Sequence, residues 1–204
     1  AACGGLVYAL GGREGFRSLG TAERLRVDEG RWEPLPPMQC RRRFLAAAAL
    51  RGRLYAVGGE DDSFVALGVA ERFVTAVERW ESLPSMPTRR RGLAALTLNG
   101  RLFAIGGGTV HRSQLPQALD VIETYDAQAD SWSTVSRLSS PRMFLVACAL
   151  SGRMYTLGGS DGTQSHRTFE RVLDGGDGQA GGVWVHMPPL PTRRVFYAGV
   201  ASSA

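Results

Sequence analysis

The sequence predicts an all-β protein built from four repeated sheets, each of four strands. Four apolar segments that end in a Gly-Gly pair recur at intervals of about 50 residues along the 204-residue chain. The four tryptophans of the chain recur in the same register. The 26 glycines and 10 prolines suit short strands joined by tight turns better than they suit helices.

The repeat is defined by four residue types that keep one register. The apolar segments are GLVYALGG (5–12), GRLYAVGG (52–59), GRLFAIGG (100–107) and GRMYTLGG (152–159). Their glycines are Gly11, Gly12, Gly58, Gly59, Gly106, Gly107, Gly158 and Gly159, and the tryptophans are Trp32, Trp80, Trp132 and Trp184. Each tryptophan is followed ten residues later by Arg42, Arg90, Arg142 or Arg194, and preceded by Glu23, Glu71, Glu123 or Glu170. Such agreement excludes a chance resemblance between the segments.

The third repeat shows how each unit forms a sheet. We expect its strands at 91–98, 101–106, 119–126 and 131–137. The first two strands are almost continuously apolar, whereas a strand with one face in water would alternate. Both faces of the sheet are therefore expected to be buried, as in the blades of a β-propeller, where sheets stack around an axis. A blade cannot bury its own faces, so its stability depends on its neighbours.

The repeat resembles the kelch repeat over all 204 residues. The resemblance lies in a Gly-Gly pair after an apolar strand, then a Glu followed by an aromatic residue, then a Trp. It is clearest in ETYDAQADSW (123–132). Leu25 and Val172 stand where the pattern has Tyr, and the fourth repeat carries the insert GGDGQAGG (175–182). The resemblance implies a kelch β-propeller with four four-stranded blades.

The blade boundaries follow from the repeat. We expect blade 1 at 5–40 plus 193–202, blade 2 at 42–88, blade 3 at 90–140 and blade 4 at 142–192. The C-terminal strand, 193–201, would complete the first blade, which resembles the seam of BTB-kelch proteins. Kelch propellers usually have more than four blades, so a closed four-bladed ring and an arc of a larger ring both remain open.

Composition and cysteine usage limit the class of protein. Hydrophobic residues make up 44% and charged residues 21% of the chain, as in ordinary globular proteins. Three distant cysteines without a CxxC pair argue against a disulfide framework or a zinc cluster. No apolar run approaches the roughly 20 residues that cross a bilayer. We therefore expect a cytoplasmic protein that is not bound to a membrane.

Catalysis is not expected. His111 and His166 fall in loops at one end of the propeller, but a copper or zinc site would need further ligands. The glycines of 175–182 lack the lysine and the helix of a phosphate-binding loop, and EDD (60–62) is best explained as a solvated loop. We predict that the protein is not an enzyme and uses no metal or other cofactor.

Arginines and aromatics recur where the repeat geometry predicts one mouth of the propeller. They lie at the start of each first strand and in the loops between the second and third strands, at 13–20, 60–68, 108–118 and 160–168. The candidate partner-binding residues are Arg41, Arg42, Arg43, Arg89, Arg90, Arg91, Arg193, Arg194, Phe16, Arg17, Phe64, His111, Arg112, His166 and Arg167. Arginine forms bidentate bonds to carboxylates, so an acidic peptide is the expected ligand. A structural role is the alternative for the arginines that recur once per blade.

The predicted function is protein binding. Resemblance to BTB-kelch adaptors implies substrate recognition for a cullin ubiquitin ligase, which would require BTB and BACK domains upstream. A scaffold or actin-binding cytoskeletal subunit is the alternative. The net charge of +5 is modest and the aromatics belong to the core, so nucleic acid is not expected as a partner. Every basic residue except the histidines is arginine, so the segment offers no lysine for ubiquitin.

Overall fold

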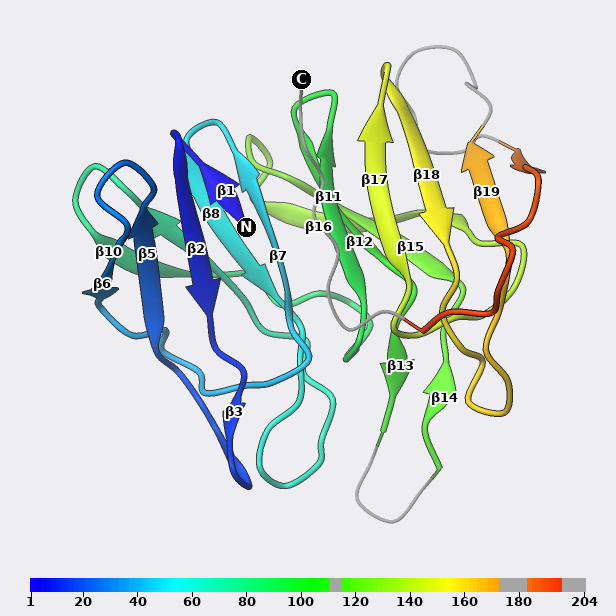
Figure 1. Cartoon of the computed structure of the whole chain (residues 1–204), viewed down its shortest axis with the longest axis horizontal. Helices are drawn as coiled ribbons and strands as arrows, with labels where there is room; N and C mark the ends of the chain where they lie inside the picture. Colours follow the sequence, from blue (N-terminus) through cyan, green and yellow to red (C-terminus); the bar gives the residue numbers. More distant parts are fainter. Residues whose placement is uncertain (111–114, 173–182, 196–204) are drawn as a thin grey trace.

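The computed structural model describes residues 1–110, 115–172 and 183–195, and within these ranges the fold is all-β. Four antiparallel four-stranded sheets are arranged around a common axis (Figure 1). The predicted four-bladed β-propeller is thus confirmed. None of the described residues belongs to a helix that is long and apolar enough to span a membrane.

Each sheet is a meander whose four strands follow one another in chain order. Blade 1 contains β1 (Ala2–Cys3), β2 (Leu6–Leu10), β5 (Ala22–Arg26) and β6 (Arg31–Leu35). Blade 2 contains β7 (Ala46–Leu50), β8 (Arg53–Val57), β9 (Ala70–Val74) and β10 (Arg79–Leu83). Blade 3 contains β11 (Ala94–Leu98), β12 (Arg101–Ile105), β15 (Val121–Asp126) and β16 (Ser131–Arg137). Blade 4 contains β17 (Val146–Leu150), β18 (Arg153–Leu157), β19 (Phe169–Val172) and β20 (Trp184–His186).

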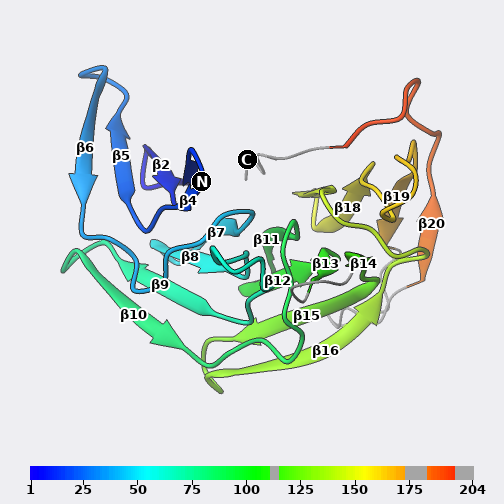
Figure 2. The same ribbon diagram turned by 90° about the horizontal axis from the view of Figure 1, so that it is seen from below.

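The turns between the first two strands of blades 2, 3 and 4 follow from their sequences. Each consists of two residues with positive φ, namely Arg51-Gly52, Asn99-Gly100 and Ser151-Gly152. Two consecutive positive φ values define the type I′ turn, whose twist matches that of the flanking strands. Among the first strands of the blades, β11 contacts both β7 and β17 near the axis, and the fourth strands lie outermost (Figure 2).

The core lies between the sheets rather than within one sheet. We call the side of a blade that faces the next blade in sequence its front face, and the opposite side its back face. Tyr8 and Leu35 on the front face of blade 1 pack against Leu54, Phe73 and Trp80 on the back face of blade 2. Equivalent clusters fill the spaces between blades 2 and 3 and between blades 3 and 4. Continuous apolar strands are therefore needed because both faces are covered.

The Gly-Gly pairs join each blade to the next. Gly58 has a φ of 64°, and a Cβ at this position would lie 2.6 Å from the carbonyl oxygen of Arg90. The amide of Gly59 donates to the same oxygen at 2.9 Å, and the amide of Gly107 donates to the carbonyl of Arg142 at 2.8 Å. The pair thus allows a close approach between two backbones that a side chain would prevent.

The first sheet takes its innermost strand from the N-terminal residues. β1 pairs with β2 through Ala2–Val7 and Cys3–Leu6, along the edge expected for the C-terminal strand. Residues 193–195 are not in a strand, and the remainder of the expected strand, 196–201, lies outside the described residues. Blades 1 and 4 occupy the two ends of an arc of sheets (Figure 2).

Candidate protein-binding face

An arginine at the start of blades 2, 3 and 4 is buried against a glutamate of the same blade. The pairs are Arg42–Glu71, Arg90–Glu123 and Arg142–Glu170. In blade 3, Arg90 Nη2 lies 3.0 Å from Glu123 Oε2, and Arg90 Nη1 donates to the carbonyls of Gly106 and Val121 at 2.9 Å each. Arg90 therefore connects the end of the second strand of blade 3 to the start of the third.

Burial limits the possible roles of these three arginine–glutamate pairs. Burial away from water lowers the pKa of the Arg42, Arg90 and Arg142 guanidinium groups, and the negative charge of the paired carboxylates opposes this lowering. All three side chains are fully buried, so no partner can reach their charged groups. Arg42 and Arg90, which the sequence places among the candidate binding residues, act as structural clamps here. Arg194, the fourth member of the series, is exposed.

Arg43 and Arg91, which follow the buried arginines of blades 2 and 3, both bind a second buried carboxylate, that of Glu60. Arg43 Nε and Nη2 donate to Glu60 Oε1 at 3.0 and 2.7 Å, and Arg91 Nη1 pairs with Glu60 Oε2. Glu60 is fully buried and joins blade 2 to blade 3 through the two arginines. A buried carboxylate with two cationic partners is stable because each oxygen is matched by charged donors. The triad of two arginines and one glutamate carries one net positive charge.

An exposed phenylalanine covers this ion triad. The Arg43 guanidinium carbon lies 4.8 Å from the centroid of the Phe64 ring, which is a cation–π geometry. Phe64 is 56% exposed and has a φ of 59°, which bulky residues rarely adopt. Asp61 Oδ1 accepts the amides of Ser63 and Val65 at 2.9 and 3.0 Å and so fixes the loop. An aromatic ring is thereby presented to solvent over an arginine.

The corresponding loop of blade 1 presents a second phenylalanine. It forms the hairpin β3 (Arg13–Glu14) and β4 (Arg17–Ser18), with Phe16 at the tip, 93% exposed, beside the exposed Arg17. The amide of Ser18 donates to Asp62 Oδ1 at 2.6 Å and connects the hairpin to the loop that carries Phe64. Hydrogen bonds from Ser18 lower the pKa of the Asp62 carboxyl.

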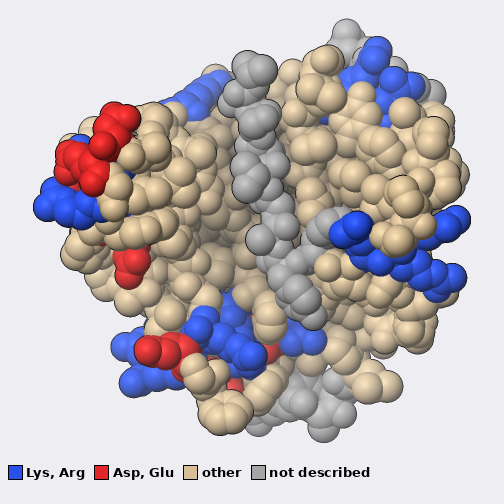
Figure 3. Space-filling view, in the orientation of Figure 1, with Lys and Arg blue, Asp and Glu red and all other residues tan. Residues whose placement is uncertain are grey.

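Arginines gather around these two loops. Arg41 and Arg89 directly precede the buried clamps, and both are exposed. Arg193 has the same position after blade 4, is also exposed, and donates from Nη1 to Gln164 Oε1 at 3.2 Å. Figure 3 shows arginines, with some acidic side chains among them, gathered over the lower edge of the molecule, where β3 and the loop after β8 project.

The equivalent loop of blade 4 carries a histidine and an arginine. His166 Nε2 lies 3.5 Å from Asp161 Oδ2, and Arg167 is exposed. Hydrogen bonds from Thr163 and Gln164 lower the pKa of Asp161. A groove of about 390 Å³ runs beside this loop, lined by His166, Arg167, Phe169, His186, Met187 and Arg193 among others. His111 and Arg112 of the blade 3 loop lie outside the described residues.

A cavity lies at the axis. It has a volume of about 260 Å³ and is lined by the first strands of blades 2, 3 and 4 and by Phe44 and Phe144. The two rings meet edge to face with centroids 5.6 Å apart, and both residues have a φ of 54°. Among the described residues no group of three His, Cys, Asp or Glu side chains is placed to hold a metal ion.

The repeat tryptophans differ in how far they are covered. Trp80 Nε1 donates to the Pro36 carbonyl at 2.8 Å and Trp132 Nε1 to the Pro84 carbonyl at 2.9 Å, in each case on the linker that precedes the blade. Trp184 is half-buried in the cluster between blades 3 and 4. Trp32, in blade 1, is 46% exposed. Tryptophan thus connects each blade to the blade before it where such a blade is present.

The decisive carboxylate of the mouth, Glu60, is not apparent from the repeat. Glu60 is the only glutamate at its position, since the equivalent residues are Arg13, Gly108 and Ser160. The repeat therefore gives it no periodic signal. The one available signal is the EDD sequence itself (60–62), an acidic run that lies between two Arg-Arg-Arg segments in the sequence.

Four stacked four-stranded sheets that carry exposed loops at one end define a β-propeller. The family model for the kelch motif matches residues 1–39, 41–87 and 89–139, which is more than half of the chain, and the chain belongs to the kelch family. Propellers of this family are mostly binding scaffolds, which suggests protein–protein interaction.

Individual relatives match over short segments. The chain is 45% identical over 51 residues to human Kelch-like protein 4, a match that covers 25% of this chain and 7% of that protein. It is 46% identical over 44 residues to mouse Kelch-like protein 1, covering 22% of this chain and 6% of that protein. The solved structure of YjhT superposes with a TM-score of 0.75 at 12% identity, over 94% of this chain and 65% of that one. The chain thus spans a small part of its relatives and about two thirds of the solved propeller.

Proposed function

We propose that the chain binds an acidic segment of another protein on the face formed by the loops between the second and third strands. The observation that carries the proposal is a pair of exposed phenylalanines, Phe16 and Phe64, on loops that a hydrogen bond between Ser18 and Asp62 connects. Solvent-exposed aromatic rings beside arginines are typical of the residues that dominate protein interfaces.

The accessible charges favour an acidic partner. Arg17, Arg41 and Arg89 are exposed, and none of them is placed in an ion pair among the residues described. Each can form a bidentate contact with a carboxylate without breaking an internal pair. Arg43 and Arg91 contribute differently, because Glu60 already binds both of them. Arg43 supports Phe64, and both arginines add to the local positive field rather than bind the partner directly.

The finer proposal is substrate recognition for a cullin ubiquitin ligase in the cytoplasm. It is supported by the resemblance to BTB-kelch propellers and by the segmental identity to Kelch-like proteins. The absence of lysine from the sequence agrees with a receptor that positions another protein for ubiquitin transfer. The propeller would present the substrate, and domains elsewhere in the full-length protein would bind the ligase.

A peptide-binding measurement tests the acidic ligand. An array of acidic peptides, each containing one apolar residue, identifies a probe, and fluorescence anisotropy then gives its affinity. Arg41→Glu combined with Arg89→Glu should weaken binding at least tenfold, and rising salt should weaken the parent protein's binding. Arg51→Glu, on the turn at the opposite end of blade 2, is the matched control and should change little. Binding that is unaffected by salt and by the double variant would contradict the proposal.

A further inference from the structure

The binding-face loops of blades 1 and 2 expose the same two residue types. Phe16 lies four residues after the Gly-Gly pair of blade 1, and Phe64 lies five residues after that of blade 2. Both phenylalanines are exposed. Arg41 and Arg89, which each directly precede a buried clamp arginine, are also exposed. The binding face therefore contains two phenylalanine–arginine pairs, Phe16 with Arg41 and Phe64 with Arg89.

Each arginine packs on the end of the loop that carries its phenylalanine. A Cβ added at Gly20, two residues before β5, would lie 3.2 Å from Arg41 Cγ. A Cβ added at Gly68, two residues before β9, would lie 3.6 Å from Arg89 Cγ. The glycine leaves space for the aliphatic part of the arginine side chain, whose charged group stays in water. The two pairs are thus built in the same way.

The two loops are held side by side. The amide of Ser18 donates to Asp62 Oδ1 at 2.6 Å, and both loops project from the same end of the molecule (Figure 1). On its other side the blade 2 loop bonds to blade 3, because the amide of Ala66 donates to the Val110 carbonyl at 3.2 Å. The stacking of the blades therefore sets the distance between the two pairs, and packed sheets lie about 10 Å apart.

The other two blades do not repeat the complete pair. The blade 3 loop carries Leu115, which is 87% exposed, but Pro141 stands at the position of the arginine. In the blade 4 loop, residues 160–168, no large apolar side chain is exposed. The face thus offers two equivalent pairs on neighbouring blades, and a ligand that uses both must itself contain a repeat.

We propose that the acidic segment contains two units, each of one apolar and one acidic residue, that begin three residues apart. The inference rests on the proposed function and adds the ligand's pattern. Carboxylates repel one another and keep such a segment extended. A polyproline II chain rises about 3.1 Å per residue and returns to the same side after three residues, which span about 9 Å. In each unit the apolar side chain packs on the phenylalanine, and the carboxylate accepts bonds from the arginine.

A series of labelled peptides with equal net charge tests the pattern. Each peptide has two leucine–glutamate units in a glycine–serine background, and the units begin two, three, four or seven residues apart. A further peptide has one such unit and a distant glutamate that restores the charge. Fluorescence anisotropy should give the highest affinity at a spacing of three residues, at least tenfold above that of the one-unit peptide, because the second unit binds intramolecularly.

Variants of single loops show whether both pairs are used. Phe64→Gly is suitable because the φ of 59° at this position favours glycine and would strain alanine. Phe64→Gly and Phe16→Ala should each lower the affinity of the three-residue peptide to about that of the one-unit peptide. Val77→Ala, which changes an exposed apolar residue at the opposite end of blade 2, is the matched control and should leave the affinity unchanged.

The outcomes separate this inference from the proposed function. Equal affinity at every spacing would overturn the inference. The proposed function would still stand if salt and the combined Arg41→Glu and Arg89→Glu changes weakened binding. An optimum at seven residues, which is two turns of an α-helix, would also overturn the extended pattern. Absence of binding to every peptide of the series and of the acidic array would overturn both.

Discussion

Blade 1 and blade 2 have the same repeat residues in different surroundings. Trp80 is 5% exposed and lies on the preceding blade, whereas Trp32 is 46% exposed. Glu71 binds a buried arginine, whereas Glu23 is exposed. The difference indicates that the repeat residues do not stabilise a blade by themselves. Their contribution to the free energy of unfolding depends on contact with the preceding blade. Matched positions of the two blades should therefore respond differently to the same substitution.

The largest difference is expected for the tryptophans. Trp80→Ala should lower the free energy of unfolding by about 3–5 kcal/mol, because it leaves a cavity in a packed cluster and an unpaired Pro36 carbonyl. Trp32→Ala should cost less than half as much, because its ring is half in water. Chemical denaturation of both variants measures the difference. Equal losses would contradict the distinction between covered and uncovered blades.

The clamp glutamates should differ almost as much. Glu71→Gln leaves the buried Arg42 charge without its counter-ion and should cost about 3 kcal/mol. Glu23→Gln should change stability by about 0.5 kcal/mol or less, as is usual for surface substitutions. Thermal and urea unfolding provide the comparison. A large loss of stability in the Glu23 variant would contradict the exposure of this carboxylate in blade 1.

The second glycines of the two blades provide a test of close approach. Gly59 and Gly12 have similar φ values of 110° and 102°. A Cβ at Gly59 would lie 2.8 Å from the Arg43 carbonyl, whereas a Cβ at Gly12 would meet nothing within 4 Å. Backbone strain is therefore shared, and the clash occurs only in blade 2. Gly59→Ala should lower the free energy of unfolding by about 1–3 kcal/mol more than Gly12→Ala, as measured by equilibrium unfolding. Equal losses would indicate that backbone strain, and not the clash, causes the whole effect.

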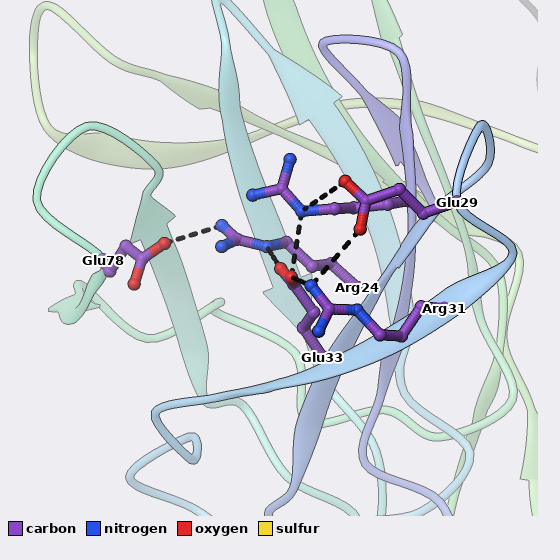
Figure 4. A network of polar contacts seen from close by, with 6 residues as sticks. Arg24, Glu29, Arg31, Glu33 and Glu78 are labelled. Carbon is purple, nitrogen blue, oxygen red and sulfur yellow. Dashed lines mark hydrogen bonds and ion pairs between the residues drawn. The ribbon is translucent and has the colours of Figure 1, made fainter.

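The smallest effect is expected for the surface ion pair between the two blades. Figure 4 shows Arg24 of blade 1 between Glu33 and Glu78, and Arg24 Nη1 lies 2.6 Å from Glu78 Oε1 in blade 2. Because the Glu78 side chain is 48% exposed, Glu78→Ala should cost about 0.2–1 kcal/mol, and less at high salt. Denaturation at two ionic strengths measures both. A loss that does not depend on salt would indicate packing rather than charge.

The sequence predicts the fold well because its signals are periodic. Gly58 and Trp80 recur in every repeat, and the strands expected for blade 3 begin and end within three residues of the observed ones. The site is harder to predict because its decisive residues occur once. Arg42 and Arg43 are adjacent in sequence, yet one binds a glutamate of the same blade and the other a loop glutamate between blades. Which arginines stay accessible depends on these partners, and no pattern of spacing reveals a unique residue such as Glu60.

The position of blade 1 at the end of the arc also has no sequence signal. Val7 and Leu54 are apolar residues at the same position of the repeat, and their exposed fractions differ because only one has a preceding blade. Periodicity identifies residues that prefer to be buried, but burial itself is decided by the number of blades and by their curvature. Both quantities belong to the propeller as a whole.

Affinity purification of the tagged full-length protein, read by mass spectrometry, tests the binding face most directly. The parent is compared with Phe16→Ala combined with Phe64→Ala, and with Val27→Ala combined with Val77→Ala as an exposed apolar control at turns away from this face. All three proteins must first show the same melting behaviour. The account predicts that a small set of proteins is lost only with the two phenylalanines, while any cullin is retained. An unchanged set of partners would contradict the assignment of this face.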